Sequence, residues 1–247
     1  MNAKRVLVTG ASRGIGRATA LRLAKAGWQV AVHYVRDEES AKSLMDALGE
    51  AGAGCYQCDM SDPGQMKSLF AQVTKDAPLH ALVNNAGIYR QLDFAGSSDA
   101  EFDATMNQIM AVNFESPARL IRLASQHFLA NDGGKVVNVC SRVAHRGEAN
   151  AAFYSASKSA LLNLTRALSV EHAKAGIQHY AIAPGWVDTA MARDGMDDRL
   201  PEILEGIPLG RMASPEDCAG AIQYLLSDEA VYLSGIVIDI NGASYLR

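Results

Sequence analysis

Short apolar runs alternate along the chain with longer segments of helical periodicity. Runs such as VLV and KVVNVC carry apolar side chains on successive residues, which is typical of parallel strands buried on both faces. We predict seven strands, at Arg5–Thr9, Gln29–Tyr34, Gly54–Cys58, Ala81–Asn84, Lys135–Cys140, Ile177–Ile182 and Ile236–Ile240. The predicted helices lie at Gly16–Ala26, Glu38–Ala51, Gly64–Lys75, Asp99–Ala130, Ala152–Ala175 and Pro215–Ser227.

Repeated β-α-β units predict a doubly wound, Rossmann-type α/β fold, with a parallel sheet of about seven strands and helices on both faces. Residues 1–247 are expected to form a single domain, because the chain shows no linker or low-complexity tract. The least regular stretch, about 186–213, follows a strand at the edge where open α/β sheets bind ligands. We expect a substrate loop there, with a surface loop of no function as the alternative.

Composition narrows the class of protein. Hydrophobic residues make up 49% of the chain and the net charge is −4, which favours a globular protein without a nucleic-acid or membrane partner. The four cysteines are too few for a disulfide scaffold, and the lone CxxC at Cys55 and Cys58 has no further zinc ligands nearby, so no metal site is expected. No apolar leader or spanning segment is present, which predicts a cytoplasmic protein.

A glycine-rich loop, Gly10-Ala11-Ser12-Arg13-Gly14-Ile15-Gly16, follows the first strand and opens a helix. Gly10 permits a sharp turn, Gly14 lets the backbone approach a pyrophosphate, and Gly16 lets the helix lie close to the strand. The free N–H groups and positive end of the helix then face the phosphates. The loop predicts a dinucleotide site, with an ordinary tight β-α turn as the alternative.

The spacing GxxxGxG and several later motifs resemble those of the classical short-chain dehydrogenase/reductases, and the resemblance spans essentially the whole chain. The motifs are Asp59 after strand three, Asn84-Asn85-Ala86-Gly87 after strand four, Asn113 in the fourth helix, Ser141 after strand five, Tyr154-x-x-x-Lys158, and Pro184-Gly185 after strand six. The resemblance implies an oxidoreductase that moves a hydride between a nicotinamide and a carbonyl or secondary alcohol.

The expected catalytic set is Asn113, Ser141, Tyr154 and Lys158. A free tyrosine has a pKa of about 10, so Tyr154 needs a stabilised phenolate to exchange protons near neutral pH. A cation about 4 Å away would stabilise the phenolate by up to ~4 kcal/mol, or about 3 pH units, and Lys158 would supply it, helped by the oxidised nicotinamide ring. Ser141 would hydrogen-bond the carbonyl oxygen. The resemblance implies that Lys158 also binds the ribose and that Asn113 holds a relay water. The structural alternatives are a strand-end cap for Ser141 and a helix-bending residue for Asn113.

The expected cofactor site gathers the glycine loop and the ends of several strands. Its residues are Gly10, Ser12, Arg13, Gly14, Ile15, Gly16, Tyr34, Arg36, Asp59, Met60, Asn85, Ala86, Gly87, Tyr154, Lys158, Pro184, Gly185, Val187 and Thr189. The resemblance implies that Asp59 binds the adenine amino group and that Val187 and Thr189 hold the carboxamide. As alternatives, Asp59 is a helix N-terminal acid, Thr189 is an N-cap, and Asn84–Gly87 stabilises the sheet.

The second strand shows which nicotinamide cofactor to expect. NAD-binding folds usually place an acid at its end, but here Tyr34 occupies that region and no acid appears before Asp37. Arg13 and Arg36 offer guanidinium groups suited to a 2′-phosphate. The sequence therefore favours NADP over NAD, with surface cations as the alternative.

The C-terminal stretch resembles 3-oxoacyl-acyl-carrier-protein reductases and related sugar and steroid reductases. Basic residues that such carrier-protein reductases typically carry before the fifth strand are missing at Asn131-Asp132-Gly133-Gly134. The arginine that they tend to carry before the sixth strand is also missing, and Lys174-Ala175 stands there. A 3-oxoacyl thioester is the expected small-molecule substrate, and a sugar, steroid or other small ketone is the alternative. A non-catalytic dinucleotide-binding regulator is disfavoured by the intact set of Asn113, Ser141, Tyr154 and Lys158.

Two predicted helices, Asp99–Ala130 and Ala152–Ala175, carry apolar residues on more than one side. They are Met106, Ile109, Met110, Phe114 and Leu120 in the first, and Phe153, Leu161, Leu162, Leu164 and Leu168 in the second. One face must cover the sheet, and a second apolar face needs another partner. With the interface that the resemblance implies, this predicts a homotetramer or homodimer.

Overall fold

A single parallel sheet of seven strands runs through the molecule in the order β3-β2-β1-β4-β5-β6-β7. The computed structural model describes residues 3–193 and 199–246. Its strands are β1 (Arg5–Val8), β2 (Gln29–Tyr34), β3 (Gly52–Gln57), β4 (Ala81–Asn84), β5 (Gly134–Val139), β6 (Ile177–Pro184) and β7 (Val237–Ile240). The predicted doubly wound α/β architecture is confirmed.

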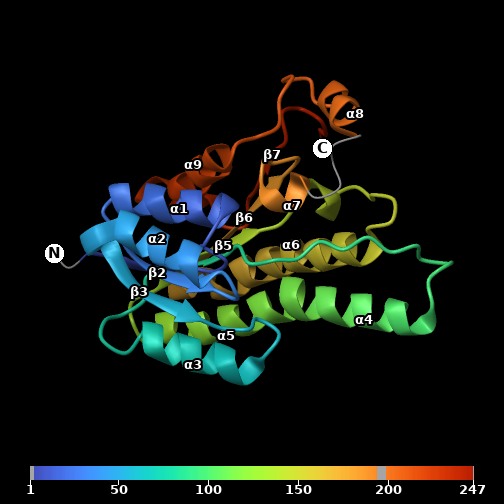
Figure 1. The fold of residues 1–247 in the computed structure, drawn as a ribbon. Helices are drawn as coiled ribbons and strands as arrows, with labels where there is room; N and C mark the ends of the chain where they lie inside the picture. Colours follow the sequence, from blue (N-terminus) through green and yellow to red (C-terminus); the bar gives the residue numbers. More distant parts are fainter. Residues whose placement is uncertain (1–2, 194–198, 247) are drawn as a thin grey trace.

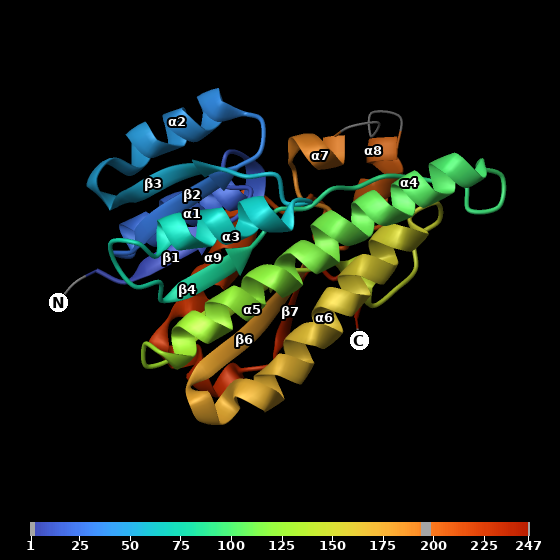
Figure 2. The same ribbon diagram turned by 90° about the horizontal axis from the view of Figure 1, so that it is seen from below.

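Helices cover both faces of the sheet, as Figures 1 and 2 show. The longer ones are α1 (Gly14–Lys25), α2 (Glu38–Leu48), α3 (Pro63–Val73), α4 (Asp99–Met110), α5 (Ser116–Leu129), α6 (Ala152–His172) and α9 (Pro215–Leu226). Helices α1, α2 and α9 pack on one face, and α3, α5 and α6 pack on the other. Along β1, Val6 and Val8 join the first core and Leu7 joins the second. Successive apolar residues are therefore buried on both faces, as predicted.

The predicted helix Asp99–Ala130 is interrupted in its middle. A π-helical turn, Ala111–Glu115, separates α4 from α5, and the Ser116 N–H donates to the carbonyl of Ala111, five residues back. Pro117 follows at the start of α5 and has no N–H to donate to the carbonyl of Asn113. A missing donor is an established cause of such a break, and isolated π turns occur frequently at functional sites.

Most other differences from prediction lie at element ends. Strand β3 begins at Gly52, two residues before the predicted start, and β6 continues to Pro184, two residues past the predicted end. The predicted helices Glu38–Ala51 and Ala152–Ala175 each finish in a 3₁₀ turn, because their last residues tighten into i→i+3 bonding. The stretch 186–213 contains two short helices, α7 (Ala190–Arg193) and α8 (Leu200–Glu205), which were not predicted. Its residues 194–198 lie outside the described part of the chain.

The order of the strands places a candidate site. Strand β1 lies between β2 and β4, so the connections from β1 and from β4 leave the sheet in opposite directions. Ligands of open α/β sheets bind at the carboxyl ends of the strands beside such a switch point. Among the helices in the described ranges, none is long and apolar enough to cross a membrane.

Candidate active site

The glycine loop turns sharply at the carboxyl end of β1. Gly10 and Gly14 have positive φ angles of 62° and 55°, which side chains other than glycine rarely adopt. A Cβ atom on Gly16 would collide with the Gly10 carbonyl oxygen, so α1 packs against the loop only because residue 16 is glycine. The first turn of α1 contains no acidic residue, and no side chain caps its N–H groups. The turn therefore presents an uncompensated positive helix end, as the sequence predicts for a phosphate site.

Three side chains, those of Asn85, Thr9 and His33, support the glycine loop through hydrogen bonds. Asn85 donates through Nδ2 to the carbonyls of Thr9 and Gly10, at 2.8 and 3.0 Å. Thr9 Oγ1 accepts the N–H of Asn85 at 2.9 Å. The buried His33 accepts the Gly10 N–H at Nδ1, at 3.0 Å, and therefore donates from Nε2 to the Cys58 carbonyl, also at 3.0 Å. Asn85 is thus part of a structural network, which sequence reasoning left open.

His33 was missed as a loop-supporting residue. The only signal was a polar residue inside the apolar run VAVHY, at the end of a buried strand. A buried polar group needs hydrogen-bond partners, and here the partners are the glycine loop and the strand beyond. Burial lowers the pKa of His33, so the ring is neutral and keeps its acceptor for Gly10.

A hollow of about 390 Å³ lies at the start of α1, beside α2. Its walls are formed by Ser12, Arg13, Gly14, Arg17, Glu39, Ser40 and Ser43. Arg17 is held there by the Ser40 carbonyl at 3.1 Å and by Ser43 Oγ at 3.3 Å. The two arginines and three serine hydroxyls are groups that can bind an anion, whereas the negative charge of Glu39 would repel one. Arg17 was not predicted from the sequence, although its place one turn into the first helix marks it as a neighbour of the loop.

The other predicted adenine-side residues are spread over two strand ends. Tyr34 is buried at the end of β2, while Arg36 is exposed. Arg36 does not line the hollow with Arg13; its charge acts instead on Asp59, whose pKa is lowered mainly by hydrogen bonds from Ser61. The Asp59 carboxylate accepts from Ser61 N and Oγ at 2.9 and 2.7 Å. Asp62, not Asp59, caps α3, and Met60 beside Asp59 is buried.

The four candidate catalytic residues come from the ends of β5 and α6 and from the π turn. Lys158 is buried and donates from Nζ to the Val139 carbonyl at 2.9 Å. Its Nζ lies 5.8 Å from the centre of the Tyr154 ring, one helical turn earlier on the same face. A hydrogen bond joins Tyr154 to Ser141, whose Oγ also accepts the Val143 N–H at 3.4 Å. Ser141 therefore caps a short turn and contacts the tyrosine as well.

The pKa of Tyr154 differs from the sequence expectation. Burial raises it to about 12, and the hydrogen bond from Ser141 opposes this shift without cancelling it. Burial also lowers the pKa of Lys158, because both groups are shielded from water. That Lys158 and the oxidised nicotinamide ring lower the pKa of Tyr154 stays a prediction for the protein with bound cofactor.

Asn113 reaches the same space from the π turn. Its Oδ1 accepts the Ile88 N–H at 2.8 Å, and its Nδ2 donates to the Ile88 carbonyl at 2.9 Å. A Cβ atom on Gly87 would lie 3.2 Å from Asn113 Oδ1 and 3.4 Å from Lys158 Nζ. The absence of a side chain at Gly87 therefore leaves a small opening between an amide and an ammonium group.

The end of β6 meets the glycine loop from the opposite side. A Cβ atom on Gly14 would lie 3.2 Å from Thr189 Cγ2. Thr189 Oγ1 also accepts the Ala192 N–H at 3.4 Å, so Thr189 caps α7, as the structural alternative predicts. Val187 bridges to Ala213, and Gly185, which follows Pro184, donates its N–H to the Ile240 carbonyl at 2.9 Å. The structure thus brings the predicted residue Thr189 next to Gly14 of the glycine loop.

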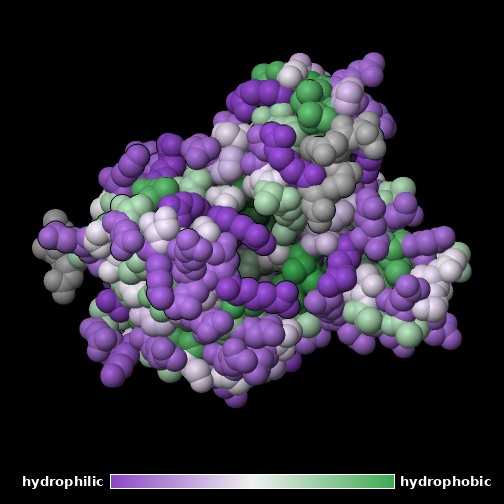
Figure 3. All heavy atoms as spheres, in the orientation of Figure 1, coloured by the Kyte–Doolittle hydropathy of each residue, from purple (hydrophilic) through white to green (hydrophobic). Residues whose placement is uncertain are grey.

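A polar and aromatic cluster surrounds Tyr154, and sequence reasoning did not single out two of its members, Arg142 and Glu148. The Tyr89 ring packs edge-on against the Tyr154 ring, with centres 5.1 Å apart, and its hydroxyl donates to Glu148 at 3.1 Å. Arg142 lies over Trp186, 5.6 Å from the ring centre. Arg142 directly follows Ser141, and this adjacency was the available signal. Figure 3 shows the face of the molecule hollowed near its centre, with hydrophobic residues inside and hydrophilic ones around the rim.

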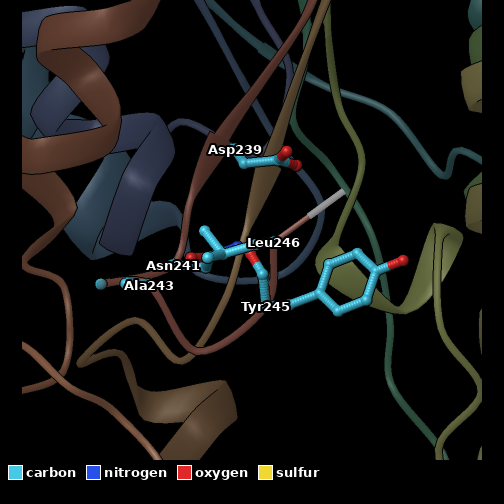
Figure 4. Close-up of a pocket in the computed structure, with 6 residues that line it drawn as sticks. Asp239, Asn241, Ala243, Tyr245 and Leu246 are labelled. Atoms are coloured by element: carbon cyan, nitrogen blue, oxygen red, sulfur yellow. The ribbon is translucent and has the colours of Figure 1, made fainter.

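A second hollow, of about 540 Å³, lies beside the C-terminal strand and tail. It is lined by Asp239, Asn241, Gly242, Ala243, Tyr245 and Leu246, most of which Figure 4 labels. The Tyr245 ring stacks on His145, with centres 6.3 Å apart. None of the predicted site residues lines this hollow.

Comparisons with known proteins agree with this geometry. A family model described as Enoyl-(Acyl carrier protein) reductase matches residues 10–243. The chain is 34% identical, over 98% of both chains, to the 3-oxoacyl-(acyl-carrier-protein) reductases FabG of Staphylococcus aureus (strain N315) and Escherichia coli (strain K12).

Two solved structures are similar over nearly their whole length. One, described as a short-chain alcohol dehydrogenase from Sinorhizobium meliloti 1021, has a TM-score of 0.91 and 33% identity over 99% of this chain and 97% of its own. The other, described as an NAD(P) dependent gluconate 5-dehydrogenase from Beutenbergia cavernae with bound NADP at low occupancy, has a TM-score of 0.90 and 34% identity over 98% and 96%. With the family model and these full-length relatives, the fold and its glycine loop show that the chain belongs to the short-chain dehydrogenase/reductase family of oxidoreductases.

Proposed function

We propose that the protein is an NADP-dependent oxidoreductase that interconverts a carbonyl group and a secondary alcohol, with Tyr154 as the general acid and base. The observation that carries this proposal is the meeting of Tyr154, Ser141, Lys158 and Asn113 at one end of the sheet, next to the glycine loop. A protein that only bound a dinucleotide would need no tyrosine there. Residues 1–247 act as one domain in this proposal, with 186–213 as the substrate loop.

The bound nicotinamide supplies or accepts the hydride. Reduction of a carbonyl places negative charge on its oxygen, which must then receive a proton. Because the pKa of Tyr154 is raised to about 12, its phenol is protonated at neutral pH and ready to donate. Ser141, already hydrogen-bonded to Tyr154, donates a hydrogen bond to the same oxygen as its charge develops.

Lys158 and Asn113 would supply the groups through which Tyr154 exchanges its proton. Lys158 Nζ keeps donors beyond its bond to the Val139 carbonyl, and the opening at Gly87 separates it from Asn113 by little more than one atom. A ribose hydroxyl or a water fits the donors and acceptors found there. We propose that Lys158 binds the ribose and that Asn113 positions a water for proton exchange.

The chain's own residues also fit the rest of a dinucleotide. The N–H groups of Ser12, Arg13, Gly14, Ile15 and Gly16 would hold the pyrophosphate, and Asn85, Ala86 and Gly87 would pass beside the ribose. Met60 and Asp59 would contact the adenine, and Val187 and Thr189 the carboxamide. The hollow lined by Arg13 and Arg17 supports a 2′-phosphate and therefore NADP over NAD. Arg36 is a weaker candidate, because it lines no part of that hollow and faces Asp59.

The substrate that we favour is a 3-oxoacyl thioester. The support is the full-length similarity to reductases whose names state this activity. A sugar acid or another small polar ketone is the second candidate, because charged and aromatic side chains gather beside Tyr154 and a similar structure is described as a gluconate 5-dehydrogenase.

The test is NADPH consumption against a panel: acetoacetyl thioesters, keto-sugars and keto-acids, steroid ketones and simple ketones. The thioester should give the highest kcat/KM. If a sugar or simple ketone exceeds it at least about tenfold, the thioester assignment is wrong while the oxidoreductase assignment stands. If the purified, folded protein binds NADPH and turns over no carbonyl, it is a binding protein.

A further inference from the structure

Arg142 and Glu148 form a charged pair on the segment between Ser141 and Tyr154. Arg142 Nη2 lies 3.8 Å from Glu148 Oε2, and their side chains are only 14% and 22% exposed. Arg142 Nη1 also donates to Ser244 Oγ at 3.3 Å, and the guanidinium lies over Trp186. Burial lowers the pKa of Arg142, which shows that water is largely excluded from it. A pair so shielded is screened less by solvent than one on the surface.

The pair is connected to Tyr154 through Tyr89. Glu148 Oε1 accepts the Tyr89 hydroxyl at 3.1 Å, while Glu148 Oε2 faces Arg142. The Tyr89 ring stands at 81° to the Tyr154 ring, with the centres 5.1 Å apart. Gln91 also donates to the Tyr89 hydroxyl, at 3.2 Å. A carboxylate with one oxygen on the arginine and the other on Tyr89 therefore fixes the side chain that packs against the proton donor.

We propose that Arg142 and Glu148 are positioning residues for Tyr154: Glu148 holds Tyr89 against the catalytic ring, and Arg142 neutralises the negative charge that Glu148 brings beside the phenol. This inference rests on the proposed role of Tyr154. It also gives a role to Arg142, which is largely shielded from water beside Ser141. Neither the glycine loop nor the catalytic set accounts for this arginine.

The groups around Tyr154 determine in which direction each substitution should shift its pKa. Cys140 and Ser141 face it from the end of β5, Lys158 from its own helix, Tyr89 from the loop after β4, and Glu148 from the loop before α6. Burial raises the pKa of Tyr154 most, and charge repulsion from Cys140, Glu148 and Tyr89 raises it further. Arg199 reaches the cluster through Tyr89, whose pKa its charge lowers. Removing Arg142 leaves Glu148 uncompensated, so proton loss from Tyr154 becomes harder.

The experiment measures alcohol oxidation against pH at saturating NADP⁺. The first probe is ethyl 3-hydroxybutyrate; if wild type does not oxidise it, the probe is the alcohol matching the carbonyl reduced fastest in the panel. Arg142→Gln should move the rising limb to higher pH and Glu148→Gln to lower pH, each by on the order of 1 pH unit, the scale for removing one nearby charge at an effective dielectric near 20. The double variant should return close to wild type, because it removes both charges.

Arg22→Gln is the control. It removes the same charge from α1, where Arg22 Nε donates to Gln223 Oε1 at 2.6 Å, on the opposite face of the sheet from α6. Its rising limb should stay near that of wild type. Tyr89→Phe keeps the ring packing and breaks the bond to Glu148, so it should lower kcat while leaving the Kd for NADPH unchanged.

Thermal midpoints and NADPH binding verify that each variant is folded. If Arg142→Gln does not fold, Arg142→Lys and Glu148→Gln carry the test. The inference is wrong if folded variants keep the wild-type limb, or if Arg142→Gln and Glu148→Gln shift it in the same direction. An active Tyr154→Phe variant would instead refute the proposed role of Tyr154, so the two failures are distinguishable.

Discussion

The side-chain amide of Asn113 pairs with both polar groups of the Ile88 backbone, at 2.8 Å to the nitrogen and 2.9 Å to the oxygen. This two-point contact joins the π turn between α4 and α5 to the loop after β4. The loop carries Gly87 and Tyr89, which border the opening beside Lys158 and the ring of Tyr154. Asn113 therefore shapes the site through the backbone as well as through its place beside Lys158.

Asn113→Ala should reduce both stability and turnover. Two hydrogen bonds to the half-buried Ile88 backbone are lost, at about 1 kcal/mol each, and the loop at 87–89 loses its support. We expect a thermal midpoint several degrees lower and kcat reduced at least about tenfold. Asn107→Ala, at an exposed position on α4, is the control and should change neither. Wild-type kcat in Asn113→Ala would remove this residue from the site.

Tyr154→Phe should bind NADPH normally and lower turnover at least about 100-fold, the usual scale for a general acid–base group. Fluorescence titration measures binding and stopped-flow measures turnover. Tyr224→Phe, at an exposed position on α9, serves as the control. Turnover within about threefold of wild type would contradict the catalytic role.

Proton release from Tyr154 should respond to the oxidised cofactor. In the free protein the pKa is raised to about 12, so the phenol stays neutral up to and beyond the range of free tyrosine. A nearby positive charge favours the phenolate, so NADP⁺ should shift its ionisation to lower pH. The measurement is the tyrosinate absorbance near 295 nm, wild type minus Tyr154→Phe, with and without NADP⁺. A shift to higher pH on adding NADP⁺ would contradict the electrostatic argument.

NADPH should be preferred to NADH at least about tenfold in kcat/KM, since one charged contact to a phosphate contributes roughly 1.5–3 kcal/mol. Arg17→Leu should lower the value for NADPH and leave that for NADH, because Arg17 lines the hollow at the start of α1. Glu39→Gln should raise the value for NADPH. Arg22→Leu, which removes a charge from the same helix where Arg22 bonds Gln223, is the control. Equal use of both cofactors would show that the hollow holds no phosphate.

Light scattering at micromolar concentration should report about four times 26.4 kDa, or twice that mass if only one interface forms. Leu161 and Leu162 lie in the core, at 1% and 3% exposure, so they do not belong to the second apolar face. The partly buried Phe114, Leu164 and Leu168 pack at the border of the same core, with Val170 82% exposed nearby, and we expect the second face there. Val170→Asp should weaken assembly more than Tyr232→Asp, on a different element. A monomeric wild type would contradict the prediction.

The sequence predicts the sheet well because its strands are unambiguous. Val6, Leu7 and Val8 must all be buried, and only a strand covered on both faces allows this. The roles of Gly10, Gly14 and Gly16 are predicted equally well, because each occupies a position where a side chain is excluded or strained. Local chemistry is enough to identify both features.

Other features depend on contacts distant in sequence. The helical pattern of Asp99–Ala130 contains no glycine, and the only signs of the π turn were Pro117 and Asn113, for which helix bending was the structural alternative. The role of His33 depends on its hydrogen bond with Gly10, which is distant in sequence. The role of Arg142 depends on its ion pair with Glu148, which in turn binds Tyr89. The raised pKa of Tyr154 likewise follows from burial, which residue spacing does not reveal.

Because the π turn joins α4 directly to α5, the number of residues between the two helices determines how their faces are oriented. An α-helix rotates by about 100° per residue, so deleting one residue within Ala111–Glu115 would turn the face of α5 by that angle relative to α4. The side chains of Leu120, Ala124 and Phe128 would then leave the sheet, or those of α4 would rotate instead. An insertion would have the opposite effect. Either change would also move the Asn113 amide away from the Ile88 backbone that it holds.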